Sequence, residues 1–124
     1  MTNESDSIAA RAAAPWVRLD DGATLGQRGS EGGVILLDDE HPAGARITLE
    51  ATGYPPFAIT CGVYGSMVHT RFLGTEEGAR REVEAMKPRL ALLAASVPYV
   101  DEPDAERRAR EVAEACSRFA EEFP

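Results

Sequence analysis

The sequence lacks a long hydrophobic run, and its first residues carry no targeting pattern. No segment approaches the roughly 18 consecutive apolar residues that a membrane-spanning helix needs. The opening stretch MTNESDS has neither the basic region nor the apolar region of a secretory signal. We therefore expect a cytoplasmic protein with no membrane partner.

Cysteine and histidine are scarce, with two residues of each. Cys61 and Cys116 lie too far apart in the sequence to resemble the disulfide framework of a small secreted domain, so we expect two buried free thiols. Of the two histidines, His41 and His69, the second is expected on the sheet face opposite Cys61, which disfavours a Cys–His nucleophile. Ser66 falls in a tight turn rather than in a strand-to-helix elbow. No catalytic residue is indicated, and a non-enzymatic role is favoured.

Basic residues are outnumbered, with 13 Lys and Arg against 21 Asp and Glu and a formal net charge of −8 at pH 7. The field of such a chain repels polyanions, which disfavours nucleic acid and anionic membranes as partners. Lysine occurs only at Lys87, and the Arg- and Ala-rich composition is typical of a GC-rich bacterial genome. The acidity leaves open a role as an antitoxin-like neutraliser of a basic protein.

The chain of 124 residues is 44% hydrophobic and 27% charged, close to the composition of ordinary globular domains. Its length suits one domain with one core. Residues 1–15 are polar and then Ala-rich up to Pro15, so we expect a flexible or loosely helical N-terminal arm. Residues 16–124 are expected to form a single domain.

Short β-rich runs separated by Gly, Asp and Pro fill residues 16–73 and indicate an antiparallel meander of about five to six strands. After Gly74 the apolar residues recur at helical spacing, which predicts helices over 75–96 and 102–123. The order of strands first and helices last predicts an α+β fold with both helices packed on one face of the sheet. The expected strands are Trp16–Leu19, Ala23–Arg28, Gly33–Asp38, Ala45–Ala51, Phe57–Tyr64 and Met67–Leu73.

Capping residues and apolar stripes define the two expected helices. Thr75 is the expected N-cap of the first helix, and Pro88 should kink or restart that helix near Lys87. Asp101 is a candidate cap for the second helix, with Pro103 in its first turn. The stripes expected to face the core are Ala79, Val83, Met86, Leu90 and Leu93 in the first helix, and Ala105, Ala109, Val112, Cys116, Phe119 and Phe123 in the second.

The hairpin over residues 57–73 fixes an expected register. Gly65 and Ser66 suit a two-residue turn, which would place Tyr64 opposite Met67. Alternation along the strands then assigns side chains to two faces. On the core face we expect Ile35, Leu37, Ile47, Leu49, Ile59, Cys61, Val63, Val68, Thr70 and Phe72. The second face should carry Leu25, Val34, Leu36, Arg46, Thr48, Glu50, Thr60, Gly62, Tyr64, Met67, His69 and Arg71.

Two groups of residues on this second face are candidates for function. The polar group would suit a small carboxylate or phosphate, because guanidinium groups bind anions and imidazole titrates near neutral pH. The simpler interpretation is a solvated polar face with no site. The aliphatic group would be exposed, since two helices can cover only one side of so small a sheet. The candidate ligand-binding residues are Arg46, Thr48, Thr60, Tyr64, His69 and Arg71, and the candidate interface residues are Leu25, Val34, Leu36 and Met67.

Neither of two further loops predicts a metal or phosphate site. Asp38–His41 is expected to be an exposed acidic turn closed by Pro42 and Gly44, because its spacing matches no metal-binding loop. Gly29–Gly33 is glycine-rich but joins two strands and lacks the lysine of a phosphate loop, so we expect a hairpin turn. No cofactor and no metal are indicated.

The favoured function is a small non-catalytic interaction module that forms a homodimer through the second sheet face, or binds another protein there. The alternative is a small-anion-binding or enzymatic domain that uses Arg46, Tyr64, His69 and Arg71. The two hypotheses differ in what they require of that face, which must be self-paired for the first and lined as a pocket for the second.

Overall fold

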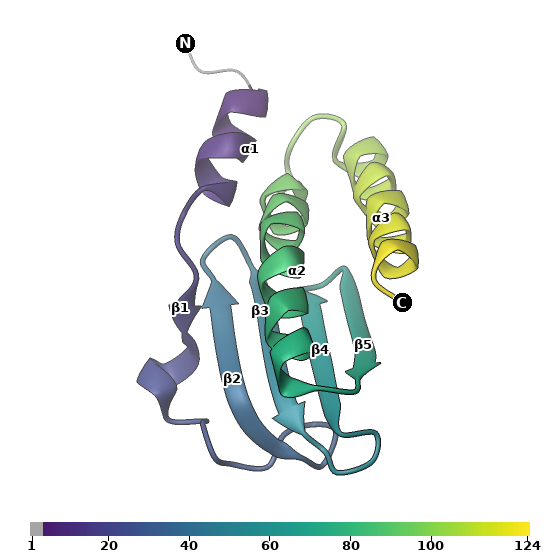
Figure 1. The fold of residues 1–124 in the computed structure, drawn as a ribbon. Helices are drawn as coiled ribbons and strands as arrows, with labels where there is room; N and C mark the ends of the chain where they lie inside the picture. Colours follow the sequence, from purple (N-terminus) through teal and green to yellow (C-terminus); the bar gives the residue numbers. More distant parts are fainter. Residues whose placement is uncertain (1–3) are drawn as a thin grey trace.

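The structure, a computed structural model, describes residues 4–124 and has the expected α+β fold. Five antiparallel strands form one sheet in the order β1-β2-β3-β4-β5, and two helices follow them (Figure 1). The elements are α1 (Glu4–Ala12), β1 (Val17–Arg18), the 3-10 helix η1 (Leu19–Gly22), β2 (Val34–His41), β3 (Ala45–Ala51), β4 (Phe57–Val63), β5 (Met67–Leu73), α2 (Glu76–Ser96) and α3 (Ala105–Glu122).

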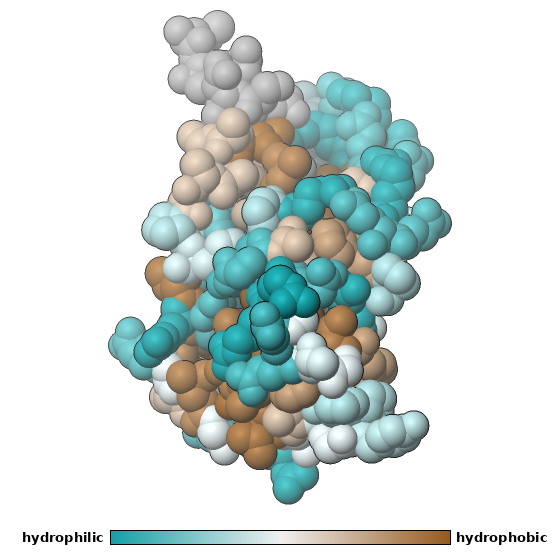
Figure 2. Space-filling view, viewed as in Figure 1, coloured by the Kyte–Doolittle hydropathy of each residue, from teal (hydrophilic) through white to brown (hydrophobic). Residues whose placement is uncertain are grey.

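The C-terminal helices lie on one side of the sheet. Helix α2 packs across β3 and β4, and α3 lies beside α2 and contacts β5 (Figure 1). From this side the surface over α3 is largely hydrophilic (Figure 2). Salt bridges such as Arg107–Glu111 at 2.9 Å and Arg89–Glu122 at 2.5 Å contribute to that surface. We call this side of the sheet the helix-covered face and the other side the open face.

The N-terminal segment contains helix α1, which packs against α2. Ile8 of α1 shares a groove with Leu92 and Leu93 of α2. The segment after α1 is tied to the sheet by His41, whose Nδ1 accepts from the Ala43 N–H at 3.1 Å while its Nε2–H donates to the Ala14 carbonyl at 2.8 Å. Residues 1–3 of the expected arm lie outside the described residues.

The core lies between the sheet and the helices, as the apolar stripes predict. All five expected positions of α2 are buried, and so are Val112, Cys116, Phe119 and Phe123 at the C-terminal end of the α3 stripe. They meet buried side chains of β3 and β4, among them Ile47, Leu49 and Ile59. The first turn of the α3 stripe is different, because Ala105 is half-buried and Ala109 is exposed.

The helix ends confirm one expected cap and correct another. Thr75 caps α2, because its Oγ1 accepts from the Gly78 N–H at 3.0 Å. Helix α2 continues through Pro88, where the sequence favoured a kink or a restart. Helix α3 begins at Ala105 and not at residue 102, and its N-cap is Asp104 in a left-handed conformation, so the expected cap by Asp101 is wrong.

The register between β4 and β5 is shifted by one residue from the expected one. Val63, and not Tyr64, lies opposite Met67, so the turn contains three residues with Gly65 at φ +78°. A one-residue shift moves every side chain of a strand to the other face. Met67, His69 and Arg71 therefore lie on the helix-covered face, and Val68, Thr70 and Phe72 lie on the open face. The expected pairs Leu49–Ile59 and Ile47–Cys61 between β3 and β4 are confirmed.

Strand β2 is longer than expected and contains a bulge. The register shifts between Ile35, which lies opposite Glu50, and Leu37, which lies opposite Leu49. The extra residue of a bulge changes the alternation of side chains. Ile35 therefore belongs to the open face, while Leu36 packs against the core. The expected acidic turn at Asp38–His41 is wrong, because these residues form the end of β2 and only residues 42–44 turn.

Candidate binding site on the open face of the sheet

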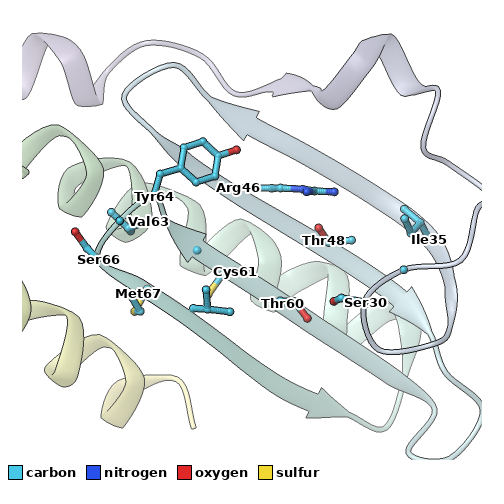
Figure 3. A pocket seen from close by; sticks show the side chains of 14 residues that line it. Ser30, Ile35, Arg46, Thr48, Thr60, Cys61, Val63, Tyr64, Ser66 and Met67 are labelled. Carbon is cyan, nitrogen blue, oxygen red and sulfur yellow. The ribbon is translucent and has the colours of Figure 1, made fainter.

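The open face holds a cavity of about 580 Å³. Thr48 of β3 and Thr60 of β4 lie along its middle, between two ends (Figure 3). Gly62 of β4 also lines the cavity. Ser30 and Ile35 lie at one end and Tyr64 and Ser66 at the other (Figure 3). The lining is mainly apolar, with hydroxyl groups and one guanidinium, that of Arg46, as its polar groups.

A buried carboxylate orients this guanidinium. Arg46 Nε donates to Asp38 Oδ1 at 2.9 Å, and its Nη2 donates to Oδ2 at 2.7 Å. Thr48 donates to Oδ1 at 3.0 Å and Thr24 to Oδ2 at 2.9 Å. The Asp38 side chain is fully buried, whereas that of Arg46 is 41% exposed. Arg46 is thus held in one orientation at the edge of the cavity.

The protonation states at this pair are well defined. Burial raises the pKa of Asp38, but the hydrogen bonds from Arg46, Thr24 and Thr48 and the charge of Arg46 more than offset that effect and hold it below its ordinary value. The hydrogen bonds and charge of Asp38 raise the pKa of Arg46 despite its partial burial. Both groups are therefore charged at neutral pH.

Tyr64 lies beside Arg46 in the lining of the cavity (Figure 3). Its hydroxyl donates to Glu40 Oε2 at 2.6 Å. Burial, this hydrogen bond and the Glu40 charge raise the pKa of Tyr64 to about 12. The phenol is therefore protonated at neutral pH and is a hydrogen-bond donor to Glu40, not a base.

A loop that the sequence did not connect with the site closes one end of the cavity. Gly33 N–H donates to Glu50 Oε1 at 3.0 Å, and Glu31 N–H donates to the same carboxylate at 3.2 Å. Glu50 is fully buried. Gly29 passes so close that a Cβ there would lie 2.4 Å from the Glu50 carboxylate. Expected as a simple hairpin turn, this segment is held against the open face and brings Ser30 to the cavity.

The six candidate ligand-binding residues divide between the two faces. Arg46, Thr48, Thr60 and Tyr64 line the cavity. His69 and Arg71 lie on the helix-covered face, where His69 Nε2–H donates to the Phe123 carbonyl at 2.6 Å and Arg71 Nη1 donates to Glu82 at 2.7 Å. These last two side chains hold α3 and α2 to β5 and are separated from the cavity by the sheet.

The candidate interface residues do not form one surface. Leu36 and Met67 pack against the core. Leu25 is 39% exposed in the loop after η1, and Val34 is 50% exposed at the start of β2, opposite Ala51. Val68 and Phe72 of β5 are large apolar residues exposed on the open face, with Tyr64 in the turn before them. Val17 of β1 is also exposed on this face, because it lies opposite Glu40, which pairs with Arg46.

Both thiols are buried, as expected. Burial raises the pKa of Cys61 to about 12 and also raises that of Cys116, so neither is a thiolate at neutral pH. The expected separation of Cys61 from His69 is wrong, since they are opposite each other in the shifted register. Within residues 4–124 no cluster of three His, Cys, Asp or Glu side chains is arranged to hold a metal ion.

Comparisons with protein-family models, curated proteins and solved structures give no significant match for this chain. None of the helices in the described part of the chain is both long and apolar enough to cross a membrane.

Proposed function

We propose that the protein is a non-catalytic binding module that takes a small, largely apolar ligand in the open-face cavity. The observation that carries the proposal is Arg46, a guanidinium fixed by the buried carboxylate of Asp38 at the edge of a mainly apolar cavity of about 580 Å³. A buried charge is costly to maintain, and removing either partner of such a pair usually destabilises a protein. Apolar side chains in place of Arg46 and Asp38 would stabilise the fold without this cost, so stability alone does not account for the pair.

The size and chemistry of the cavity support this proposal. Ligand sites in proteins commonly measure about 300–1,000 Å³ and combine apolar walls with a few oriented polar groups. No imidazole lies beside the hydroxyl groups of Thr48 and Thr60, because both histidines face the helix side of the sheet. The carboxylate that accepts from Thr48, that of Asp38, has a lowered pKa and is therefore a weak base. Binding without covalent chemistry therefore suits the residues better than catalysis.

We predict that benzyl alcohol, an uncharged probe, shifts the backbone amide signals of Thr48, Thr60 and Gly62 in heteronuclear NMR spectra. Thr60→Phe places a ring in the cavity and should weaken that binding by about tenfold or more. Thr70→Phe is the matched control, because both variants remove the 3.3 Å contact between the two hydroxyls but Thr70 does not line the cavity. Equal binding by the two variants, or no shifts in the parent, would reject the proposal.

A second candidate function is self-association through the open face. On β5, Val68 lines the cavity and is 80% exposed, and Phe72 is 52% exposed. Exposed apolar residues grouped on an uncovered sheet face are typical of interaction surfaces, and a two-fold dimer needs a patch that can pair with itself. This candidate uses residues different from the aliphatic group that the sequence indicated.

Sedimentation velocity tests the second candidate. We expect Val68→Asp to shift a dimer toward monomer, because two carboxylates would be buried in a symmetric contact. Val100→Asp provides the control, since Val100 is 99% exposed in the connection between α2 and α3 and lies away from the sheet. A parent that is monomeric at high concentration, or a Val68→Asp variant that stays dimeric, excludes this interface.

A further inference from the structure

We propose that the ligand of the open-face cavity is an uncharged molecule with a carbonyl or amide oxygen, which accepts a hydrogen bond from Arg46, and an apolar body that lies over Thr60 and Gly62. The proposal rests on the proposed function and names the chemical class of ligand. The preference for an uncharged ligand follows because the carboxylate of Asp38 already compensates the positive charge of Arg46.

The carboxylate of Asp38 is saturated with donors. Each of its oxygens accepts two hydrogen bonds, one from Arg46 and one from a threonine hydroxyl, at 2.7–3.0 Å. A bidentate Arg–carboxylate pair of this kind is close to neutral as a unit. The cavity therefore meets an oriented dipole and not an isolated positive charge.

Arg46 nevertheless has hydrogen atoms left for a ligand. A guanidinium carries five N–H donors, and the contacts with Asp38 use those of Nε and one of Nη2. Within residues 4–124, Nη1 has no protein partner, and the Arg46 side chain is 41% exposed. A neutral acceptor oxygen would satisfy these donors without adding charge to a mainly apolar cavity.

Charged ligands fit this site less well. Asp38 and Glu40 give the surroundings of Arg46 one more negative charge than positive charge, and both act on its pKa. An anion would meet that excess, and it would lose hydration against the apolar lining. A cation would also lose hydration there and would face the guanidinium directly. The second guanidinium that could have reversed the balance for anions, that of Arg71, lies on the other face of the sheet, as does His69.

Three probes of nearly the same shape test the class of ligand: benzamide, benzoate and benzamidine, which are neutral, negative and positive at neutral pH. We expect benzamide to bind at least about tenfold more tightly than either charged probe, measured by titration of the Thr48, Thr60 and Gly62 amide signals. Benzamide should also bind more tightly than benzyl alcohol, whose hydroxyl is a weaker acceptor.

Asp38→Asn supplies the mechanistic test, because it removes the compensating charge and keeps the shape of the side chain. In this variant benzoate should gain affinity and overtake benzamide. Val100→Asn, far from the cavity, should leave the order of the three probes unchanged. The comparison in the parent protein needs no variant, so it decides the class of ligand even where Asp38→Asn does not fold.

The outcomes separate this inference from the proposed function. If benzoate or benzamidine matches or exceeds benzamide in the parent, the inference is wrong and the cavity remains a binding site. If benzyl alcohol binds but benzamide gains nothing over it, Arg46 does not recognise a carbonyl group. If none of the probes shifts the cavity amides, both proposals fail.

Discussion

Phe119→Ala is expected to lower the free energy of unfolding by about 3–5 kcal/mol, the range for removing a fully buried aromatic ring. The Phe119 side chain is completely buried, and its ring lies 4.9 Å from that of Phe123 and 6.3 Å from that of His69. It thereby joins α3 to β5 and the core. Alanine would leave a void that α3 cannot close without breaking the contact between His69 and the Phe123 carbonyl.

Urea denaturation followed by circular dichroism measures this effect, with Phe72→Ala as the matched control. Phe72 is 52% exposed on the open face, so its truncation should change stability by about 1 kcal/mol or less. Similar losses for the two variants would contradict the docking of α3 on β5. They would also reopen the question of which face of β5 meets the core.

The sequence could predict the elements that depend on periodic burial. The apolar stripe of α2 recurs at steps of three and four residues, and every one of its predicted positions is buried. Likewise, the pairing of β3 with β4 follows from alternation over seven residues on each strand. In both cases many residues indicate the same helix face or the same strand register, so a wrong assignment at one residue has little effect.

The face of β5 depended on a single turn residue, and the prediction there failed. A two-residue and a three-residue turn are both compatible with Tyr64, Gly65 and Ser66, yet they place His69 and Arg71 on opposite faces. The bulge beside Ile35 has the same consequence in β2. Four of the ten candidate residues assigned to the second face therefore lie on the side that the helices cover: Leu36, Met67, His69 and Arg71.

The candidate site was predicted only where its residues belong to β3 and β4 or border them. Arg46, Thr48, Thr60 and Tyr64 were identified because alternation places them on one face. Alternation also placed Glu50 on this face, but its role in holding the loop was not predicted, and Asp38 was assigned to a turn. Their partners Gly33 and Thr24 come from a loop far from them in the sequence. The available signal was glycine at the positions where the loop backbone passes close to the sheet. Gly29 and Gly33 are these positions, but they were interpreted as turn residues.

Gly33→Ala is expected to lower the free energy of unfolding by about 2–4 kcal/mol, because it combines overpacking with the loss of a buried hydrogen bond. A Cβ at Gly33 would lie 2.5 Å from the Ala51 carbonyl oxygen and 2.8 Å from Thr52 Cγ2. The backbone of Ala51 is fixed by pairing with β4, so the loop must move instead. That movement withdraws the Gly33 N–H from Glu50, whose carboxylate is fully buried.

Gly74→Ala is the control for this variant, because a Cβ at Gly74 meets nothing within 4 Å and its φ is not positive. Thermal and urea unfolding should therefore show a large loss for Gly33→Ala and little or none for Gly74→Ala. The same loop brings Ser30 to the end of the cavity, so Gly33→Ala should also weaken benzyl alcohol binding at temperatures where the variant is still folded. Unchanged stability of Gly33→Ala would mean that the loop is not held against Glu50. Unchanged binding of benzyl alcohol by a destabilised Gly33→Ala variant would mean that the loop is not a wall of the cavity.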